Sequence, residues 1–138
     1  MYIIKRFSIV VLMMAFMSSC ILEEVEPEYD VVGAIGTISN VTASSQTPTV
    51  GQTVTFTVNF YSEHEPAREL RMNRLIGGAP NNLTTRTFTT WNTEDSYVET
   101  FQYEVPAGTA GTTINMQFQL ISASDYSVTR NINLVVRP

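Results

Sequence analysis

The sequence is poor in the residues that build metal centres, disulfides and nucleic-acid interfaces. Its 138 residues contain one cysteine and one histidine, which excludes an internal disulfide, a four-cysteine metal site and a CxxC redox pair. Lysine and arginine together number 8 against 13 acids, so the net charge is −5. Nucleic-acid affinity depends on neutralising phosphates, and an acidic chain without a basic patch therefore excludes a nucleic-acid partner. The length allows one domain.

The first 19 residues predict a secretory signal peptide that is removed from the mature chain. A short basic segment, Lys5-Arg6, precedes an apolar run over residues 7–17, and two serines and Cys20 follow. Basic, apolar and small residues in this order are the plan of such a peptide. An 11-residue helix spans about half of the ~30 Å hydrocarbon core of a bilayer. A transmembrane helix is therefore the poorer interpretation.

The segment Met17-Ser18-Ser19-Cys20 resembles the lipobox of bacterial lipoproteins. The resemblance implies that the Cys20 sulfur receives a diacylglycerol, that the chain is cut between Ser19 and Cys20, and that the new amino group is acylated. Met17 stands where the family usually has leucine, but it is similar in size and apolarity. Several long acyl chains on one residue would hold the protein on a membrane almost permanently, since each buried CH₂ contributes about 0.8 kcal/mol. A buried apolar cysteine is the alternative, and the position of Cys20 directly after the apolar run disfavours it.

An acidic segment follows Cys20 and predicts an extended tether over residues 20–32. Residues 21–30 hold five acids and no base, and like charges keep such a segment extended. The segment resembles the export signal of surface-exposed lipoproteins in Bacteroidota, and the resemblance assigns that signal to Glu23, Glu24 and Glu26. It implies the outer leaflet of the outer membrane, facing the medium. A periplasm-facing anchor is the alternative.

Residues 33–138 predict an all-β domain with about seven strands. The clearest strand is 53–60, where Val54, Phe56, Val58 and Phe60 alternate with polar residues. Strict alternation with β-branched and aromatic residues indicates a strand with one buried face. Proline and glycine fall between such runs, as expected of turns, and the prolines in these gaps are Pro48, Pro66, Pro80 and Pro106. Similar segments predict further strands at 35–43, 83–90, 97–105, 113–120 and 128–136.

Residues 65–76 allow two interpretations. Pro66 lies at a first-turn position and Gly77 follows the last residue of the segment, which are start and stop signals of a helix. Leu70 and Met72, however, alternate with polar residues, and a sandwich needs a third strand here. We favour the strand, because tertiary context commonly overrides local propensity.

Three segments resemble the Ig-like domains of bacterial surface lipoproteins, of the PKD or fibronectin-III general shape. They are residues 47–56, 105–114 and 122–129, which look like the entry to strand B, the E–F turn and the F–G hairpin. The resemblance implies an Ig-like antiparallel β-sandwich. The sequence departs from the family after Asp125, because the glycine that usually follows this aspartate is missing. The cysteine pair and core tryptophan of antibody domains are also absent.

Ig topology predicts that the loops at about 61–67, 91–96 and 122–127 meet at one end of the sandwich. We call this the loop end. A solvated, charged loop end is the simplest interpretation. The carboxylates could instead bind Ca²⁺, since they are hard-oxygen ligands, although no fixed Asp-x-Asp spacing is present. The aromatic residues could form a sugar platform. The acids are Glu63, Glu65, Glu94, Asp95 and Asp125, and the aromatic residues are Trp91, Tyr61 and Tyr126.

Ig topology also places the N-terminus at the loop end, so a lipid tether would hold these loops towards the membrane. The opposite end, with residues 44–52, 77–82 and 106–111, is uncharged. We expect a partner to meet that end or a sheet face.

An enzyme is not expected. The single histidine, His64, offers no Ser-His-Asp arrangement, and no glycine-rich phosphate loop opens a helix. The sequence predicts a lipid-anchored surface module that binds or adheres to a protein or a glycan. A structural accessory subunit of an outer-membrane assembly is the alternative, and an enzyme or inhibitor is a distant one. Apart from the lipid on Cys20 and the Ca²⁺ option, no cofactor is implied.

Overall fold

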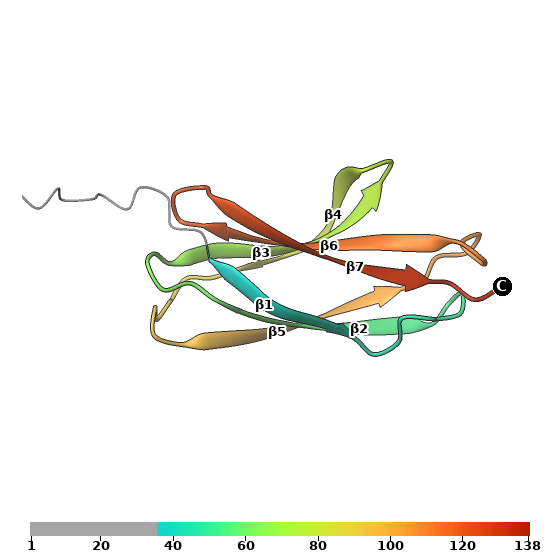
Figure 1. Ribbon diagram of the computed structural model, residues 1–138, viewed down its shortest axis with the longest axis horizontal. Helices are drawn as coiled ribbons and strands as arrows, with labels where there is room; N and C mark the ends of the chain where they lie inside the picture. Colours follow the sequence, from blue (N-terminus) through green and yellow to red (C-terminus); the bar gives the residue numbers. More distant parts are fainter. Residues whose placement is uncertain (1–35) are drawn as a thin grey trace, which may run out of the picture. The chain divides into compact units, whose positions relative to one another are not determined.

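The computed structural model describes residues 36–138, in which seven strands form two packed sheets (Figure 1). The predicted signal peptide, the cleavage and lipidation site and the acidic export segment lie outside the described residues. Within residues 36–138, no helix has the length and apolar character needed to cross a membrane.

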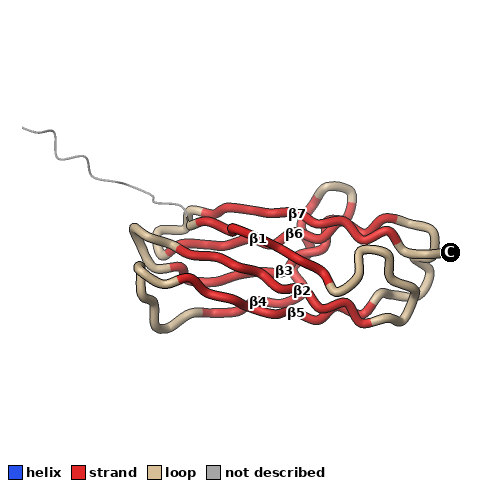
Figure 2. The backbone as a smooth tube through the Cα atoms, turned by 60° about the horizontal axis from the view of Figure 1, so that its bottom comes forward, coloured by secondary structure: helices blue, strands red, loops and turns tan. Residues whose placement is uncertain are grey.

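The two sheets have the topology of an Ig-like sandwich, which confirms the predicted fold class. One sheet has the order β1-β2-β5 and the other has the order β4-β3-β6-β7, and all paired strands are antiparallel. Figure 2 shows the strands running lengthwise, with loops at the two ends and one further turn that projects from the side between them. The strands are β1 (Thr37–Ala43), β2 (Thr53–Tyr61), β3 (Ala67–Ile76), β4 (Ala79–Thr87), β5 (Ser96–Glu104), β6 (Thr113–Ser122) and β7 (Ser127–Val135).

The alternating residues predicted to point inward form the core. Those of β2 and β6 are at most 2% exposed: Val54, Phe56, Val58, Phe60, Ile114, Met116, Phe118 and Leu120. Phe118 joins the two sheets, because its ring lies 5.3 Å from that of Phe56 and 5.5 Å from that of Phe101. Burial of each such side chain contributes about 1.5–3 kcal/mol, so this interlayer contact stabilises the sandwich.

The ambiguous segment at 65–76 is a strand, as favoured from the sequence. β3 lies between β4 and β6 in the four-stranded sheet, and Leu70 and Met72 are almost fully buried beneath it. A central strand satisfies its backbone on both sides and buries one face, which outweighs the helix signals at its two ends.

The expected strand at 83–90 is displaced: β4 covers Ala79–Thr87. The sequence interpretation placed Pro80 in a gap between strands, and that was wrong. Gly77 and Gly78 have φ values of 61° and 84°, which glycine adopts readily, so the hairpin turn is short and β4 begins directly after it. β4 is an edge strand, and an edge position tolerates a residue without a backbone N–H.

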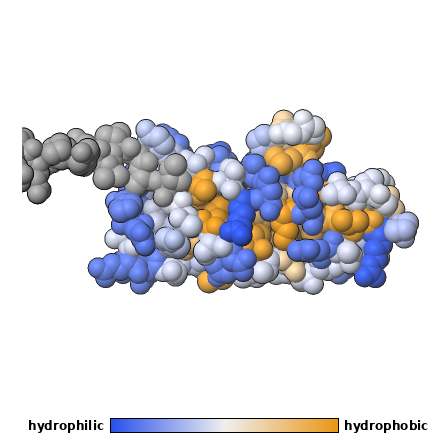
Figure 3. All heavy atoms as spheres, viewed as in Figure 1, coloured by the Kyte–Doolittle hydropathy of each residue, from blue (hydrophilic) through white to orange (hydrophobic). Residues whose placement is uncertain are grey.

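The β3–β4 hairpin projects away from the three-stranded sheet (Figure 1). Figure 3 shows apolar residues gathered on this projection. Two of its large apolar side chains are exposed, Ile76 at 57% and Leu83 at 39%. The hairpin therefore carries exposed apolar side chains both beside its turn, at Ile76, and in the middle of β4, at Leu83.

The β1–β7 side of the sandwich is closed by backbone hydrogen bonds. Residues 46–48 run parallel to the end of β7: the N–H groups of Val135 and Arg137 donate to the carbonyl oxygens of Gln46 and Pro48, at 2.8 and 2.9 Å. Such cover protects a sheet edge from pairing with another chain. On the opposite side of the sandwich, the edges are β4 and β5.

Candidate functional site

The loops predicted to meet at one end do lie together. Tyr61 and Glu63 from the β2–β3 connection line an open hollow of about 120 Å³ with Glu94 and Asp95 from the β4–β5 connection. A neighbouring hollow of about 150 Å³ shares Tyr61 and Glu63 and is also lined by Gly36. The described part of the chain therefore begins at the loop end.

Two of the five predicted acids there have structural partners. The hydroxyl of Ser124 donates to both carboxylate oxygens of Glu65, at 2.6 and 2.8 Å. Arg68 forms an ion pair with Asp125, and this contact raises the pKa of the Arg68 guanidinium. The first pair joins the β2–β3 and β6–β7 loops, and the second joins the β6–β7 loop to the start of β3, so Glu65 and Asp125 stabilise the loop end.

The other three acids, Glu63, Glu94 and Asp95, are exposed at the rim of the hollow. Within residues 36–138, no group of three or more His, Cys, Asp or Glu side chains is placed to hold a metal ion. Ca²⁺ binding at the loop end stays a prediction from the sequence.

The predicted aromatic residues do not share one role. Trp91 stacks on Tyr97 with ring centroids 4.2 Å apart and meets Phe88 edge-on at 5.4 Å. Its indole N–H donates to the carbonyl oxygen of Ser62 at 3.2 Å, so the ring is packed against the end of the core. Tyr61 lines both hollows. Tyr126 is 43% exposed on the β6–β7 loop.

A second candidate surface is the outer face of the four-stranded sheet, which the sequence alone did not reveal. Four amide side chains, one from each strand, stand next to one another in register. Directly opposed residues of paired strands share a face and interact. We call this set the amide row; it comprises Asn82 of β4, Asn73 of β3, Gln117 of β6 and Asn131 of β7.

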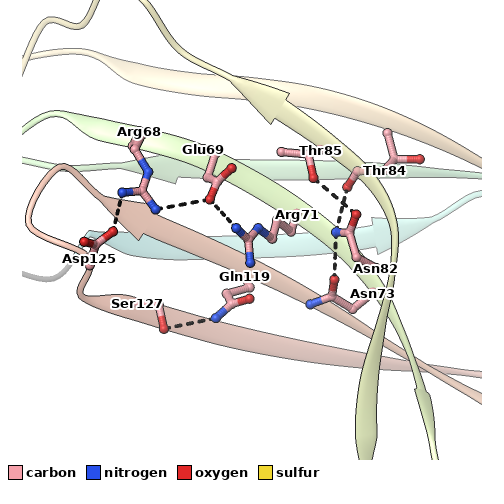
Figure 4. A network of polar contacts seen from close by, with 10 residues as sticks. All are labelled: Arg68, Glu69, Arg71, Asn73, Asn82, Thr84, Thr85, Gln119, Asp125 and Ser127. Carbon is pink, nitrogen blue, oxygen red and sulfur yellow. Dashed lines mark hydrogen bonds and ion pairs between the residues drawn. The ribbon is translucent and has the colours of Figure 1, made fainter.

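Hydrogen bonds orient three of the four amides, and Figure 4 shows those of Asn73 and Asn82 with each other and with their threonine neighbours. Asn82 Nδ2 donates to Asn73 Oδ1 at 3.0 Å, and Asn73 Nδ2 donates to Gln117 Oε1 at 3.4 Å. The hydroxyl of Thr85 donates to Asn82 Oδ1 at 3.3 Å. Asn73 is only 2% exposed, so its neighbours cover it although it lies on the outer face. Asn82 and Gln117 retain exposure and can contact a ligand.

The charged groups of this face lie towards the loop end. Arg71 donates to the Glu69 carboxylate at 2.5 Å, and Arg68 reaches the same oxygen at 3.3 Å. Gln119 donates to the hydroxyl of Ser127 at 3.2 Å. The amide row itself carries no formal charge, so this part of the face suits a neutral ligand rich in hydrogen-bonding groups.

Comparison with known proteins gives a fold and no family. No family model matches the chain, and no curated protein matches it. A Niemann-Pick type C2 protein from the Japanese carpenter ant is similar in structure, with a TM-score of 0.53 and 7% identity over 76% of this chain and 94% of that one. The sporulation control protein Spo0M of Bacillus subtilis has a TM-score of 0.51 and 11% identity, over 78% of this chain and 51% of that one. Such likeness at low identity supports the Ig-like sandwich architecture alone.

Proposed function

We propose that this protein is a lipid-anchored, non-enzymatic binding module of the bacterial cell envelope. The outer face of its four-stranded sheet would be the contact surface. The amide row carries this proposal, because it is an oriented set of hydrogen-bonding side chains on a sheet face. The Ig-like sandwich supports it as a scaffold that holds such a face rigid.

The lipid anchor is supported by the lipobox-like segment that ends at Cys20. β1 begins at Thr37, and 16 residues separate it from Cys20. A fully extended segment of that length would reach about 50 Å. A tether of that length at the loop end would leave the sheet faces free to meet a partner.

The anchor and its leaflet can be tested in the native host. Metabolic labelling with palmitate, followed by intact-mass analysis, should show a triacylated mature chain that begins at Cys20, and Cys20→Ala should abolish the label. Protease added to intact cells should digest the domain. Replacing Glu23, Glu24 and Glu26 by alanine should protect it, because the protein would then face the periplasm. A wild-type protein that carries no palmitate label and is released from cells in soluble form without detergent would contradict the anchor.

An accessory subunit of an outer-membrane assembly is the second candidate, and the exposed apolar side chains of the β3–β4 hairpin favour it. They are Ile76 beside the turn and Leu83 in the middle of β4. Crosslinking on cells followed by purification should then recover a membrane partner, and Ile76→Ser with Leu83→Ser should lose it. Val98 is a matched control, since it is 59% exposed on β5 of the other sheet. Val98→Ser should retain the partner.

A further inference from the structure

We infer that the amide row is the binding site for a neutral, linear polysaccharide whose chain lies across the four strands. This inference rests on the proposed binding function and names its ligand class and orientation. The inference follows from the spacing, hydrogen bonding and lack of charge of the four amides, and from the apolar residues Leu75 and Pro80 beside them.

The spacing matches a sugar chain. Neighbouring strands of a sheet lie about 4.8 Å apart, and each strand contributes one amide in register. That interval is close to the length of one pyranose unit in an extended polysaccharide. A chain running perpendicular to the strands would therefore meet Asn82, the Asn73 position, Gln117 and Asn131 in turn, one for each sugar unit.

The chemistry of the row suits hydroxyl groups. An amide side chain offers two N–H donors and a carbonyl acceptor, which is the combination that a pair of neighbouring sugar hydroxyls requires. Asn73 is buried and bonded on both sides, so it is a positioning residue that holds Asn82 and Gln117 in place. Side chains that are oriented before binding lose little conformational entropy when the ligand arrives.

The neighbouring positions on the same face complete the surface. Leu75 pairs with Pro80 on one side and with Asn115 on the other, and Asn115 pairs with Asn133. This second line is apolar on β3 and β4 and amide-bearing on β6 and β7. Pyranose rings have apolar C–H faces as well as hydroxyls, and the two lines together offer contacts to both.

Charge selects a neutral polymer over a charged one. Six arginines and 13 acids follow Lys5-Arg6 in the sequence, a net charge of −7, which disfavours polyanionic glycans. The Glu69 carboxylate on this face is paired with Arg71, so it is not free to bind a polycation. The uncharged amide row is therefore suited to an uncharged polysaccharide.

The experiment uses the mature, lipidated protein in detergent micelles. Its binding to cello-, xylo-, manno- and malto-oligosaccharides of two to six units is measured by calorimetry, with alginate and chitosan oligomers as charged comparisons. We expect at least one neutral series to bind, with an affinity that rises with each unit up to four and then levels off. Asn82→Ala and Gln117→Ala should each weaken binding by about fivefold or more, as expected for the loss of a hydrogen bond. Each also removes a hydrogen-bond partner of the buried Asn73 amide, so the unfolding temperature of each variant is measured first and binding is compared at a temperature where all variants are folded.

Matched controls lie on the outer face of the other sheet. Asn59 and Thr57 are polar residues of β2 that alternate with its core residues, and Asn59→Ala with Thr57→Ala should leave binding unchanged. Asn73→Asp is expected to reduce affinity for the oligosaccharides without removing a ligand contact, because a carboxylate cannot donate to Gln117 Oε1 and therefore no longer holds Gln117 in place. If Asn73→Asp does not fold, the Asn82 and Gln117 variants still decide the outcome.

Three results would overturn the inference: no binding in any neutral series, tighter binding to a charged oligomer, or binding that survives both Asn82→Ala and Gln117→Ala. These results differ from failure of the proposed function. If the lipidated protein captures a membrane protein but binds no glycan, the proposed binding function stands. The amide row is then not a glycan site. An unlipidated protein that binds through the row refutes only the anchor.

Discussion

Tyr103 places a hydroxyl in the core without a hydrogen-bond partner among the described residues. The residue is 8% exposed on the inner face of β5. Burial raises the pKa of Tyr103 above its ordinary value of 10.0, against the opposing effect of the nearby Arg74 guanidinium. The folded protein therefore holds the phenolic proton more tightly than the unfolded chain does.

Tyr103→Phe should leave stability at pH 7 unchanged or raise it by up to about 1 kcal/mol, since an unpaired buried hydroxyl is removed. In the wild type, the stability linked to this proton is present below pH 10 and is lost as the pH rises through the raised pKa. Urea unfolding at pH 7 and at pH 10.5 checks both statements. If Tyr103→Phe loses as much stability between pH 7 and pH 10.5 as the wild type does, the loss comes from other titrating groups.

Trp91 illustrates why an aromatic residue in a loop is not by itself a ligand platform. Its ring packs on Tyr97 and Phe88, and its N–H is bonded to Ser62. We expect Trp91→Ala to lower stability by about 2–4 kcal/mol, somewhat below the range for a fully buried tryptophan. Trp91→Phe should keep most of the packing and lose about 1 kcal/mol with the hydrogen bond.

Thermal unfolding followed by near-UV circular dichroism measures both variants. Equal stability of Trp91→Ala and the wild type would show that the aromatic cluster does not support the loop end. Any loss of ligand binding in Trp91→Ala has to be compared with this loss of stability before it is assigned to contact.

Individual inward residues are predictable from the sequence, whereas the amide row is not. Alternation along a single strand is enough to place Phe56 or Met116 in the core. Asn73 and Asn82 become neighbours only through the register of β3 with β4, which shifts at a bulge after Met72. A bulge of one residue moves every later pair, and no local pattern in the sequence records its position.

At the scale of elements, one arginine of β7 links β1 to the other sheet. The Arg130 guanidinium donates to the carbonyl oxygens of Ile38 and Ser39, at 3.1 and 2.7 Å, where the register of β1 with β2 shifts. It thereby joins the edges of the two sheets across the β1–β7 side of the sandwich. These are charge-assisted bonds, which are stronger than neutral ones.

We therefore expect Arg130→Gln to cost about 1–2 kcal/mol of stability and to speed amide hydrogen exchange in β1 more than in β6. Hydrogen exchange followed by mass spectrometry resolves the two strands. Arg137 is a useful control, since its side chain bonds only the hydroxyl of Thr47, at 3.1 Å. Arg137→Gln should leave exchange in β1 close to that of the wild type, and uniform acceleration in both variants would contradict a local role for Arg130.

The segment at 65–76 shows where local signals at the scale of elements fail. Helix-forming residues, Pro66 and Gly77 agree with one another locally, yet the segment is a central strand. Its neighbours β4 and β6 provide hydrogen bonds on both sides, and the core accepts Leu70 and Met72. The alternation of Leu70 and Met72 with polar residues and the need for a third strand in the sandwich favoured the correct interpretation. Pro80 shows the converse, since its place in β4 depends on β4 being an edge.

For the whole described domain, the order of strands and the meeting of the loops follow from the Ig-like pattern of the sequence. The function of the loop end does not follow from it. The acids predicted there as ligands divide into structural pairs, such as Glu65 with Ser124, and exposed groups, such as Glu94. Which carboxylate finds an internal partner depends on loop conformations that the sequence pattern does not determine.

The two sheets share one core, and the whole domain should therefore unfold as a unit. Phe118 is the best residue for testing this cooperative unfolding, because it is fully buried on β6 and contacts Phe56 and Phe101 of the other sheet. Phe118→Ala should cost about 3–5 kcal/mol, a large part of the 5–15 kcal/mol typical of a domain.

Urea unfolding of Phe118→Ala should show one transition with a midpoint lower than that of the wild type and an unchanged slope, since the same surface becomes exposed. Far-UV circular dichroism and tyrosine and tryptophan fluorescence should report the same midpoint. Val98→Ala, an exposed substitution on β5, should shift the midpoint little. Separate midpoints for the two probes would mean that the sheets lose their structure independently, and the outer face of the four-stranded sheet could then persist after the loop end has melted.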